Sequence, residues 1–393
     1  MRAVILAAGK STRTYPLTLT RPKCLLKIGN KTILEHNLEQ LAGLVNEAVI
    51  VIGYKYGEIK KLGRKFRDIK LTYIEQKEQL GTGHALLQAE KLIKGRFIVL
   101  MGDDLYGRDS IKRCLKHKYC LLADKSNNPS KFAVLKVKGN RIMDILEKPA
   151  KASSDLVNCG LYVLDQKIFA HLKKLRKSPR GEYEITDAIK SLAREARINY
   201  ELARGTWHPV AYSWDMLNVN EHGLKRIKRS IRGKIERNAT IKGSVIIGKN
   251  TLVKNGAYIE GPAIIGDNCI IGPNCYIRNS CIGENCRIGN SVEVKSCILM
   301  ENVNVGHLSY LGDSIIGSSV NIGAGTITAN LRHDGDTVKS IINGKKIDTG
   351  RKKFGAVIGD NAKIGINTLI YPGRKIWPDK ATLPGEIVKK DLM

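Results

Sequence analysis

The chain has 393 residues, of which 42% are apolar and 26% are charged, a balance that excludes a disordered chain and allows two globular domains. Its formal net charge of +29 favours anionic partners: nucleic acid, an acidic membrane surface or small phosphorylated molecules. No apolar run is long enough to span a bilayer, so we expect a soluble protein without a membrane partner. Nine cysteines, an odd number, and no secretory signal favour the reducing cytoplasm.

From Met1 to about Glu221, short apolar runs alternate with segments whose apolar residues recur at helical spacing. We predict strands over residues 3–6, 47–53, 71–76, 97–104, 132–138 and 159–164, and helices over 32–44 and 81–93. The alternation predicts an α/β Rossmann-like domain over residues 1–222. Its sheet should be largely parallel and covered on both faces, with ligands bound beyond the carboxyl ends of the strands.

The densest basic run begins at Lys225 and continues to Lys234. We predict a linker helix over residues 223–237, with these cations on a solvated face. A nucleic-acid patch is the alternative. Basic and aromatic residues do not interleave here, so no nucleic-acid partner is expected.

From about residue 238 an Ile-Gly core recurs at hexad-like spacing in nine segments, among them VIIGKN (245–250) and AVIGDN (356–361). Such hexapeptide repeats predict a left-handed parallel β-helix, in which each coil buries one face against the next. We expect this domain to cover residues 238–385 and a polar tail to follow over 386–393.

Three cysteines in the repeats, Cys269, Cys275 and Cys281, lie six residues apart. We expect them to stack at equivalent positions of successive turns as a packing ladder. Zinc ligation would need CxxC pairs or histidine partners, which this stretch lacks.

The segment LAAGKSTRTYPLTLTRPK (6–23) follows the first predicted strand and has the composition of a phosphate-binding loop. Small residues and Gly9 allow backbone N–H groups to approach a triphosphate, and Arg13 and Lys23 add positive charge. A simple structural turn is the alternative for a single glycine loop. The complete pattern, LAAGxxTR followed by PK, is more specific.

This pattern resembles the signature of the sugar-1-phosphate nucleotidylyltransferases. The segments EQKEQLGTGHA, MGDD, ILEKP, VNCGLYVL and GEYEITDAI resemble the same family in order and spacing. The resemblance implies that the nucleotide is bound by Leu6, Ala8, Gly9, Gln76, Gly81 and Thr82, and the sugar phosphate by Glu147, Lys148 and Asn158. It also implies that Asp103 holds Mg²⁺ and that Arg13 and Lys23 are the catalytic cations.

The implied reaction is nucleotidyl transfer. A sugar-phosphate oxygen attacks the α-phosphorus of UTP or dTTP, and pyrophosphate leaves. Such a transfer needs positioning and charge neutralisation more than a protein nucleophile, and cations with a carboxylate-bound Mg²⁺ supply both. Asp103 as a helix cap is the alternative to a metal ligand.

Several positions depart from the family pattern. Ser11 stands where the loop usually has a second glycine, and Ala133 where a Tyr-Gly pair is usual. In TWHPVAYSWDML, Pro209 stands in the position of a second metal-binding aspartate, and the later Asp215 is interpreted as structural. His208 is a poorer Mg²⁺ ligand than a carboxylate.

In the second half, the stretch NVGHLSYLGDSIIGSSVNIGAGTITAN (304–330) breaks the hexad register around His307, Tyr310, Asn321 and Asn330. A lone histidine is usually structural. Here the spacing allows the four side chains to line one groove, and the insertion that follows leaves the coil as a loop over a groove would.

This stretch resembles the acetyltransferase domain of the bifunctional N-acetylglucosamine-1-phosphate uridylyltransferases and their archaeal relatives. The resemblance implies that His307 is the general base, which takes a proton from the amine of glucosamine-1-phosphate as the nitrogen attacks acetyl-CoA. It implies that the backbone N–H at Ala324 faces the oxyanion. Tyr310, Asn321 and Asn330 would hold groups of the sugar and acetyl-CoA.

Cations on either side complete the resemblance. Arg278 and Lys295 are implied to bind the phosphate of the acceptor, although the gap between them is one residue shorter than usual. Lys339 and the cations of GRKKF (350–354) would contact phosphate or CoA, and a solvated loop is equally consistent. The family also implies a homotrimer with acetyltransferase sites between neighbours.

Two hypotheses of different class follow. The first is a bifunctional cytoplasmic enzyme that acetylates glucosamine-1-phosphate and joins the N-acetylglucosamine-1-phosphate so formed to UTP or dTTP. The second is an acetyltransferase or a regulatory or assembly subunit whose nucleotidyltransferase domain binds ligand with weak or no turnover, as Pro209 and Ala133 suggest.

Overall fold

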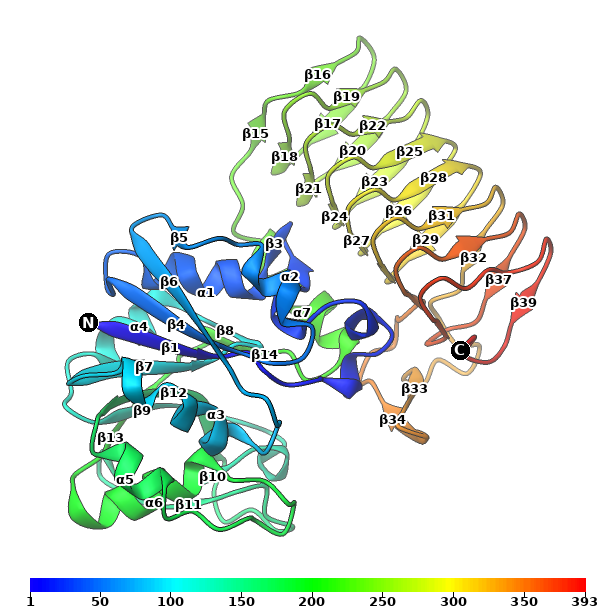
Figure 1. The fold of residues 1–393 in the computed structure, drawn as a ribbon. Helices are drawn as coiled ribbons and strands as arrows, with labels where there is room; N and C mark the ends of the chain where they lie inside the picture. Colours follow the sequence, from blue (N-terminus) through cyan, green and yellow to red (C-terminus); the bar gives the residue numbers. More distant parts are fainter. The chain divides into compact units, whose positions relative to one another are not determined.

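The computed structural model describes all 393 residues, which fold into two compact units (Figure 1). The first unit contains residues 1–10, 22–25 and 33–209, and the second contains 11–21, 26–32 and 210–393. The chain contains no helix with both the length and the apolarity needed to cross a membrane.

A ten-stranded sheet forms the centre of the first unit (Figure 1). In spatial order its strands are β10 (Val134–Lys138), β11 (Arg141–Leu146), β13 (Asn199–Leu202), β9 (Cys120–Lys125), β12 (Leu156–Asp165), β7 (Arg96–Met101), β1 (Arg2–Leu6), β4 (Glu47–Ile52), β6 (Ile69–Glu75) and β5 (Lys65–Phe66). Strands β7, β1, β4 and β6 run parallel, as predicted. Beyond them the sheet is mixed, because β12 runs antiparallel to both β7 and β9, and the two-residue connection from β10 to β11 permits only a hairpin.

Helices cover both faces of this sheet. They are α1 (Ile33–Leu41), α2 (Tyr56–Lys60), α3 (Thr82–Gln88), α4 (Arg108–Cys114), α5 (Ile168–Leu172) and α6 (Ile185–Glu195). Side chains alternate along each strand, so that Ala3 and Ile5 of β1 pack in one core with α1 and α4, whereas Val4 and Leu6 pack in the other with α3, α5 and α6. A two-stranded ribbon of β8 (Asp104–Tyr106) and β14 (Trp207–Pro209) lies outside the main sheet.

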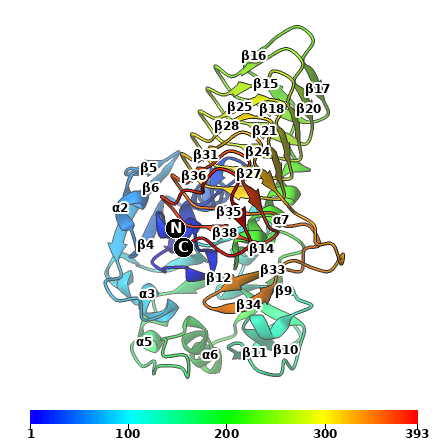
Figure 2. The same cartoon turned by 90° about the vertical axis from the view of Figure 1, so that its right-hand side faces the viewer.

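The second unit is built around three parallel sheets (Figures 1 and 2). The first sheet contains β15 (Ser230–Ile231), β18 (Val245–Ile247), β21 (Ala263–Ile265), β24 (Cys281–Ile282), β27 (Ile298–Leu299), β30 (Ile315–Ile316), β35 (Val357–Ile358) and β38 (Lys375–Ile376). The second contains β16 (Lys234–Ile235), β19 (Leu252–Val253), β22 (Ile270–Ile271), β25 (Arg287–Asn290), β28 (Asn304–His307), β31 (Asn321–Ile322) and β36 (Lys363–Ile364). The third contains β17 (Thr240–Lys242), β20 (Tyr258–Glu260), β23 (Tyr276–Arg278), β26 (Glu293–Lys295), β29 (Tyr310–Gly312), β32 (Ile327–Thr328), β37 (Leu369–Ile370) and β39 (Ile387–Val388).

Each coil contributes one strand to each sheet, except that the last coil has none in the second sheet, and this is the left-handed parallel β-helix predicted from the hexads. The hairpin of β33 (Lys339–Ile342) and β34 (Lys345–Asp348) is inserted between two coils. The same unit includes helix α7 (Ser213–Leu224) and the short hairpin of β2 (Lys27–Ile28) and β3 (Lys31–Thr32).

The hexads fold this way because their last residue turns the corner of the coil. Asn250, Asn268 and Asn361 all adopt the left-handed backbone conformation, with φ between 55° and 62°. Asparagine tolerates this conformation better than other residues with a side chain. The corners also stack, since the Asn250 side-chain amide donates to Asn268 Oδ1 one coil further on, at 3.2 Å.

The cysteines are arranged differently from our prediction. A coil contains three hexads, so that Tyr258 pairs with Tyr276, and residues six apart lie on different sides of one coil. The prediction that Cys269, Cys275 and Cys281 stack on successive turns is therefore wrong. Because Ile270 pairs with Arg287 on the next coil, the neighbour of Cys269 is Cys286. All nine cysteines are buried and free, so packing is still their role.

The ends of the β-helix also differ from our prediction. Helix α7 ends at Leu224, and the residues predicted as a linker helix over 223–237 already form β15 and β16 of the first coil. Gly233 explains this, because a Cβ atom there would lie 2.4 Å from the carbonyl oxygen of Thr251 in the next coil. The predicted tail over 386–393 contains β39 and a β-bridge from Leu392 to Ile376, and so belongs to the last coil.

A charged network lies at three stacked coil corners of the second unit. The Arg21 guanidinium donates to Asp360 Oδ2 at 2.6 Å, to Ser318 Oγ at 2.6 Å and to Glu301 Oε1 at 3.2 Å. Lys27 Nζ lies 3.1 Å from Glu301 Oε2. Burial favours a higher pKa for Glu301, but the hydrogen bond from Ser318 and the charges of Lys27 and Arg21 outweigh it and lower the pKa to about 2.

Replacing Gly289 with alanine should destabilise the β-helix. An added Cβ would meet the Gly306 carbonyl oxygen at 1.9 Å, and backbone cannot move aside as a side chain can. We expect Gly289→Ala to lower the free energy of unfolding by about 3 kcal/mol in chemical denaturation. Gly306→Ala is the matched control, since its Cβ meets nothing within 4 Å. Equal stability of the two variants would contradict the stacking described here.

The lowered pKa of Glu301 predicts a pH-dependent contribution to stability. A carboxylate with a depressed folded-state pKa stabilises the fold above its ordinary pKa of 4.5 and loses this contribution as the pH falls through about 2. Glu301→Gln should lower the free energy of unfolding by about 3 kcal/mol at pH 6, with the deficit shrinking towards pH 2. Glu284→Gln, at an exposed corner one coil earlier, serves as the control and should change little at either pH.

Candidate functional sites

The predicted nucleotide-binding residues of the first unit gather at one edge of the sheet. Strands β1, β4, β6 and β7 are parallel, so the segments that follow them meet beyond their carboxyl ends. Leu6 ends β1, and Ala8 and Gly9 come after it, while Gln76 follows β6 and Asp103 follows β7. The structure thus brings these segments together, and their contact with a nucleotide stays a prediction.

Two glycines bring these segments close together. A Cβ at Gly102 would lie 2.8 Å from the Leu6 carbonyl oxygen, and one at Gly53 would lie 2.8 Å from the Ala8 carbonyl oxygen. Neither position has room for a side chain. The loop after β1 is therefore enclosed on both sides by the loops after its neighbouring strands.

Gln76 is buried and held in place. Its amide nitrogen donates to the Gly81 carbonyl oxygen at 3.1 Å and lies 3.0 Å from His84 Nδ1. Gly81 has φ of 109°, and a Cβ there would meet the Tyr183 carbonyl oxygen at 2.7 Å. These contacts fix the start of α3, where Thr82 was predicted to contact the nucleotide.

The sugar-phosphate residues lie near the same helix start. Thr82 Oγ1 accepts from the Ile185 N–H at 3.1 Å, and the hydroxyl of the next residue, Thr186, donates to Glu147 Oε2 at 3.2 Å. Glu147 also pairs with Arg180 at 3.1 Å, a cation that the sequence analysis did not single out. The segment GEYEITDAI thus connects the two parts of the predicted site.

Asn158 and Lys148 border the remaining part of this site. The Asn158 amide donates to the Tyr162 hydroxyl at 2.7 Å, and its backbone N–H donates to the Ala133 carbonyl oxygen at 2.8 Å. Lys148 Nζ lies 3.9 Å from Glu147 Oε1. Ala133 departs from the family pattern in its side chain but still contributes a backbone contact to the predicted sugar site.

Lys23 and Asp103 form a close ion pair. The ammonium of Lys23, whose side chain is only 4% exposed, lies 2.7 Å from Asp103 Oδ2, and the Asp103 side chain is 42% exposed. A single accessible carboxylate fits a Mg²⁺ ion that is held mainly by water and substrate phosphates. No group of three or more His, Cys, Asp or Glu residues could hold an ion without a substrate.

The residues around β14 that differ from the family pattern have defined positions in the structure. Pro209 pairs with Asp104 and His208 with Leu105, so the ribbon brings no second carboxylate next to Asp104. Asp215 is structural, as expected. Its carboxylate accepts from the N–H groups of Ala211 and Tyr212, and it caps the first turn of α7.

Arg13 and Ser11 belong to the second unit. The Arg13 guanidinium lies over the Tyr212 ring, 5.6 Å from its centroid. Ser11 has φ of 53°, the left-handed conformation that favours glycine, which explains why glycine is usual there. Its carbonyl oxygen accepts from the hydroxyls of Thr14 and Thr18, at 2.8 and 2.9 Å, so the loop closes on itself.

The β-helix brings the predicted phosphate-binding cations into one column. Arg278 pairs with Lys295, and Lys295 pairs with Gly312, so all three occupy the same position on successive coils. The shorter gap between Arg278 and Lys295 is therefore a coil of 17 residues in full register. Arg278 also donates to Glu293 at 2.9 Å, while its Nε is buried without a partner.

A further lysine joins this column from the segment after the β33–β34 hairpin. Burial and the neighbouring ammonium of Lys353 lower the pKa of Lys295. Two nearby ammonium groups repel each other unless an anion binds between them. The sequence singled out the segment GRKKF, but it could not distinguish Lys353 from Lys352, because the insertion removes the hexad register.

Tyr310 and Asn330 lie together on the same face. The Asn330 amide donates to the Tyr310 hydroxyl at 3.2 Å and to Asp313 Oδ2 at 2.6 Å. Arg351 pairs with the other oxygen of Asp313 at 3.4 Å. This network holds the start and the end of the hairpin insertion against the coil, and the sequence analysis did not predict Asp313 or Arg351 in it.

His307 ends β28 and is exposed at a coil corner. The next residue, Leu308, has φ of 49°, and Ser309 Oγ donates to the His307 carbonyl oxygen at 2.8 Å. The backbone turn directs the imidazole away from the packed interior. The chain then enters β29 with Tyr310, so both side chains belong to the same coil.

The remaining predicted residues lie around this coil. Asn321 is on the next coil, where it accepts from Asn304 at 2.7 Å, and Ala324 is in the turn that follows, its carbonyl oxygen accepting from the Asn367 N–H. Lys339 lies apart on β33, where it lines a pocket with Arg332, Lys346, Tyr371, Arg374 and Lys389. It stays a prediction as a substrate contact.

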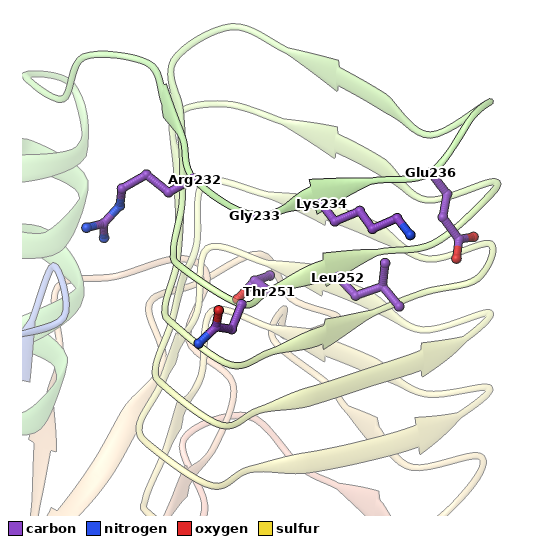
Figure 3. Close-up of a pocket in the computed structure, with 7 residues that line it drawn as sticks. Arg232, Gly233, Lys234, Glu236, Thr251 and Leu252 are labelled. Atoms are coloured by element: carbon purple, nitrogen blue, oxygen red, sulfur yellow. The ribbon is translucent and has the colours of Figure 1, made fainter.

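A pocket on the first two coils contains none of the predicted site residues (Figure 3). Arg232, Lys234, Glu236, Thr251 and Leu252 line it, with side chains that point in different directions. This pocket therefore does not change the assignment of either candidate site.

Both halves of the chain match known protein families. Residues 2–225 match the family model described as nucleotidyl transferase, and residues 259–381 match the GMPPB C-terminal domain. A bifunctional protein GlmU from Methanococcus vannielii is 42% identical over 400 residues, covering 100% of this chain and 96% of that protein. A bifunctional sugar-1-phosphate nucleotidylyltransferase/acetyltransferase from Sulfurisphaera tokodaii is 38% identical over 401 residues, covering 100% of this chain and 98% of that protein.

Among solved structures, a putative glucose-1-phosphate thymidylyltransferase from Bacillus anthracis is similar to this chain with a TM-score of 0.54. The two are 26% identical, and the match covers 58% of this chain and 97% of that one. This chain therefore belongs to the family of bifunctional sugar-1-phosphate nucleotidylyltransferase/acetyltransferases.

Lys353 should matter for binding an anionic acceptor. We expect Lys353→Met to raise the KM for an amino-sugar phosphate about tenfold, since it removes one of two adjacent cations, with a smaller effect on kcat. The measurement is initial-rate kinetics of CoA release. Lys352→Met removes the adjacent exposed lysine and is the matched control. An equal effect of the two substitutions would show that only the general positive charge matters.

Proposed function

We propose that the second unit transfers the acetyl group of acetyl-CoA to the amine of glucosamine-1-phosphate. The first unit then joins N-acetylglucosamine-1-phosphate to UTP or dTTP and releases pyrophosphate. The observation that carries the proposal is the column of Arg278 and Lys295 on the two coils before the exposed His307, with the ammonium of Lys353 near enough to lower the pKa of Lys295. It combines an anion site with an exposed base, which is what an amine acceptor bearing a phosphate requires.

In the acetyl transfer, the two lysines would hold the phosphate and so place the amine near His307. As the amine nitrogen attacks the thioester carbonyl, His307 would accept the proton that the nitrogen loses. The carbon–sulfur bond then breaks and CoA leaves with the electron pair. Tyr310 and Asn330 would orient the sugar hydroxyls, and the backbone N–H of Ala324 would face the oxyanion.

In the nucleotidyl transfer, Lys23 and Arg13 would neutralise charge on the phosphates as pyrophosphate leaves. Asp103 would hold Mg²⁺, which when bound screens the negative charge of the triphosphate. Gln76 would face the pyrimidine base from its fixed position beside α3. Glu147 and Asn158 would bind the sugar phosphate that attacks the α-phosphorus.

Self-association as a homotrimer is part of the proposal. Ile327, Leu369 and Ile387 pair in register on three successive coils and are 36%, 42% and 48% exposed. Such an apolar column is suited to burial against a neighbouring β-helix. We also propose that the protein is located in the cytoplasm. Its nine free cysteines support this location, because the cytoplasm is a reducing compartment.

His307→Ala should lower kcat for CoA release by about 10²- to 10⁴-fold, because the amine loses its proton acceptor. The assay follows CoA release with glucosamine-1-phosphate and acetyl-CoA, and pyrophosphate release with N-acetylglucosamine-1-phosphate, UTP and Mg²⁺. The same variant should release pyrophosphate at the wild-type rate.

Lys23→Met provides the reciprocal test, since it should abolish pyrophosphate release and leave CoA release unchanged. Near-normal CoA release by His307→Ala would remove the imidazole from the mechanism. An absence of pyrophosphate release from the wild-type protein with every nucleotide and sugar phosphate tried would refute the nucleotidyl-transfer half.

A further inference from the structure

The loop that carries Arg13 is fastened to the β-helix at its far end. Residues 11–21 belong to the second compact unit, and Arg21 is separated from Lys23 only by Pro22. Arg21 is therefore linked, through Pro22 alone, to the buried lysine that pairs with Asp103.

The fastening is short, charged and mostly buried. Asp360 Oδ2 accepts from the Thr20 hydroxyl at 2.6 Å and from Arg21 at 2.6 Å, and the side chains of Arg21 and Asp360 are 16% and 7% exposed. Ion pairs with such geometry are costly to break, because the partner left behind keeps its charge in a poorly hydrated place. Glu301 and Ser318 supply further acceptors to the same guanidinium.

An aromatic column supports Arg13 from the same unit. Arg13 lies over Tyr212, the Tyr212 ring stacks on Trp214 at 4.5 Å, and Trp214 meets the edge of Phe354 at 6.0 Å. Phe354 is fully buried at the point where the hairpin insertion rejoins the coil. One end of the loop thus rests on the β-helix corners, and the other end rests on Tyr212 at the start of α7, which reaches Phe354 of the β-helix through Trp214.

The coil itself does not require this arrangement, as an equivalent corner shows. In IIGDN, Asp267 Oδ1 accepts from the Lys249 N–H at 2.7 Å, just as Asp360 Oδ1 in VIGDN accepts from the Ser318 N–H at 2.8 Å. Asp267 pairs only with the half-exposed Arg232, at 3.4 Å. Both aspartates thus accept a hydrogen bond from the neighbouring coil corner. Only Asp360 also binds the loop.

We propose that Asp360 and Glu301 are positioning residues for nucleotidyl transfer, which act through Arg21 to hold the loop of Arg13 and Lys23. This inference rests on the proposed nucleotidyl-transfer function of the first unit.

The test uses the full chain with Asp360→Asn, Arg21→Met, Arg21→Lys, the double variant Asp360→Asn/Arg21→Met, and Asp267→Asn as matched control. Asparagine keeps the oxygen that caps Ser318 and removes the charge that holds Arg21. Pyrophosphate release and CoA release are measured on each protein, and hydrogen–deuterium exchange is followed for a peptide that covers residues 11–21. CoA release reports on the fold of the β-helix in every sample.

We expect Asp360→Asn and Arg21→Met each to lower kcat for pyrophosphate release about tenfold or more, with KM for the nucleotide changed less. Their double variant should be no slower than the slower single variant, since both break one contact. Arg21→Lys should recover part of the rate. CoA release should stay within about twofold of wild type throughout, and Asp267→Asn should match wild type in both assays.

Kinetics of Asp360→Asn equal to those of Asp267→Asn would overturn the proposal, as would fully additive effects in the double variant. Faster exchange of the 11–21 peptide in Asp360→Asn with an unchanged kcat would show a tether without a positioning role, which also overturns it. If wild-type protein releases CoA but no pyrophosphate, the nucleotidyl-transfer function has failed, and the inference falls with it.

Discussion

The central constraint on this molecule is the in-register stacking of the β-helix coils. Parallel strands in adjacent coils repeat every position at a spacing of about 4.8 Å, so a side chain at one place has a neighbour at the same place above and below. That rule places Arg278 next to Lys295 and stacks the corners of Glu301, Ser318 and Asp360. Both the proposed anion site and the contacts of Arg21 with the coil corners depend on this register.

The first unit also brings together segments that are distant in the sequence, but not by stacking coils. There the parallel strands β1, β4, β6 and β7 end at one edge, and each contributes a loop rather than a stacked position. Glycines at the ends of β4 and β7 remove the side chains that would separate the loops. The result is an edge of short loops with a few charges, where we propose that a polyphosphate binds, whereas we propose that the side chains of the coil face bind a small sugar phosphate.

Much of this architecture could be predicted from the sequence because it is periodic. Strand–helix alternation and Ile-Gly hexads reflect local requirements, and the asparagines at several corners reflect a backbone conformation that few residues adopt. The cysteine ladder was misplaced because the unit that stacks is a coil of three hexads rather than one hexad. Lys353 and the Arg21–Asp360 pair were beyond sequence reasoning, since the first follows an insertion without register and the second joins residues 339 apart.

The claim on which the account depends most is that the paired lysines recognise the phosphate of the acceptor. It is tested most directly by isothermal titration of the wild-type protein with glucosamine-1-phosphate and with glucosamine, which lacks only the phosphate. The account predicts that loss of the phosphate weakens binding by about a hundredfold, the value of a doubly charge-assisted contact. Equal affinity for the two sugars would contradict it.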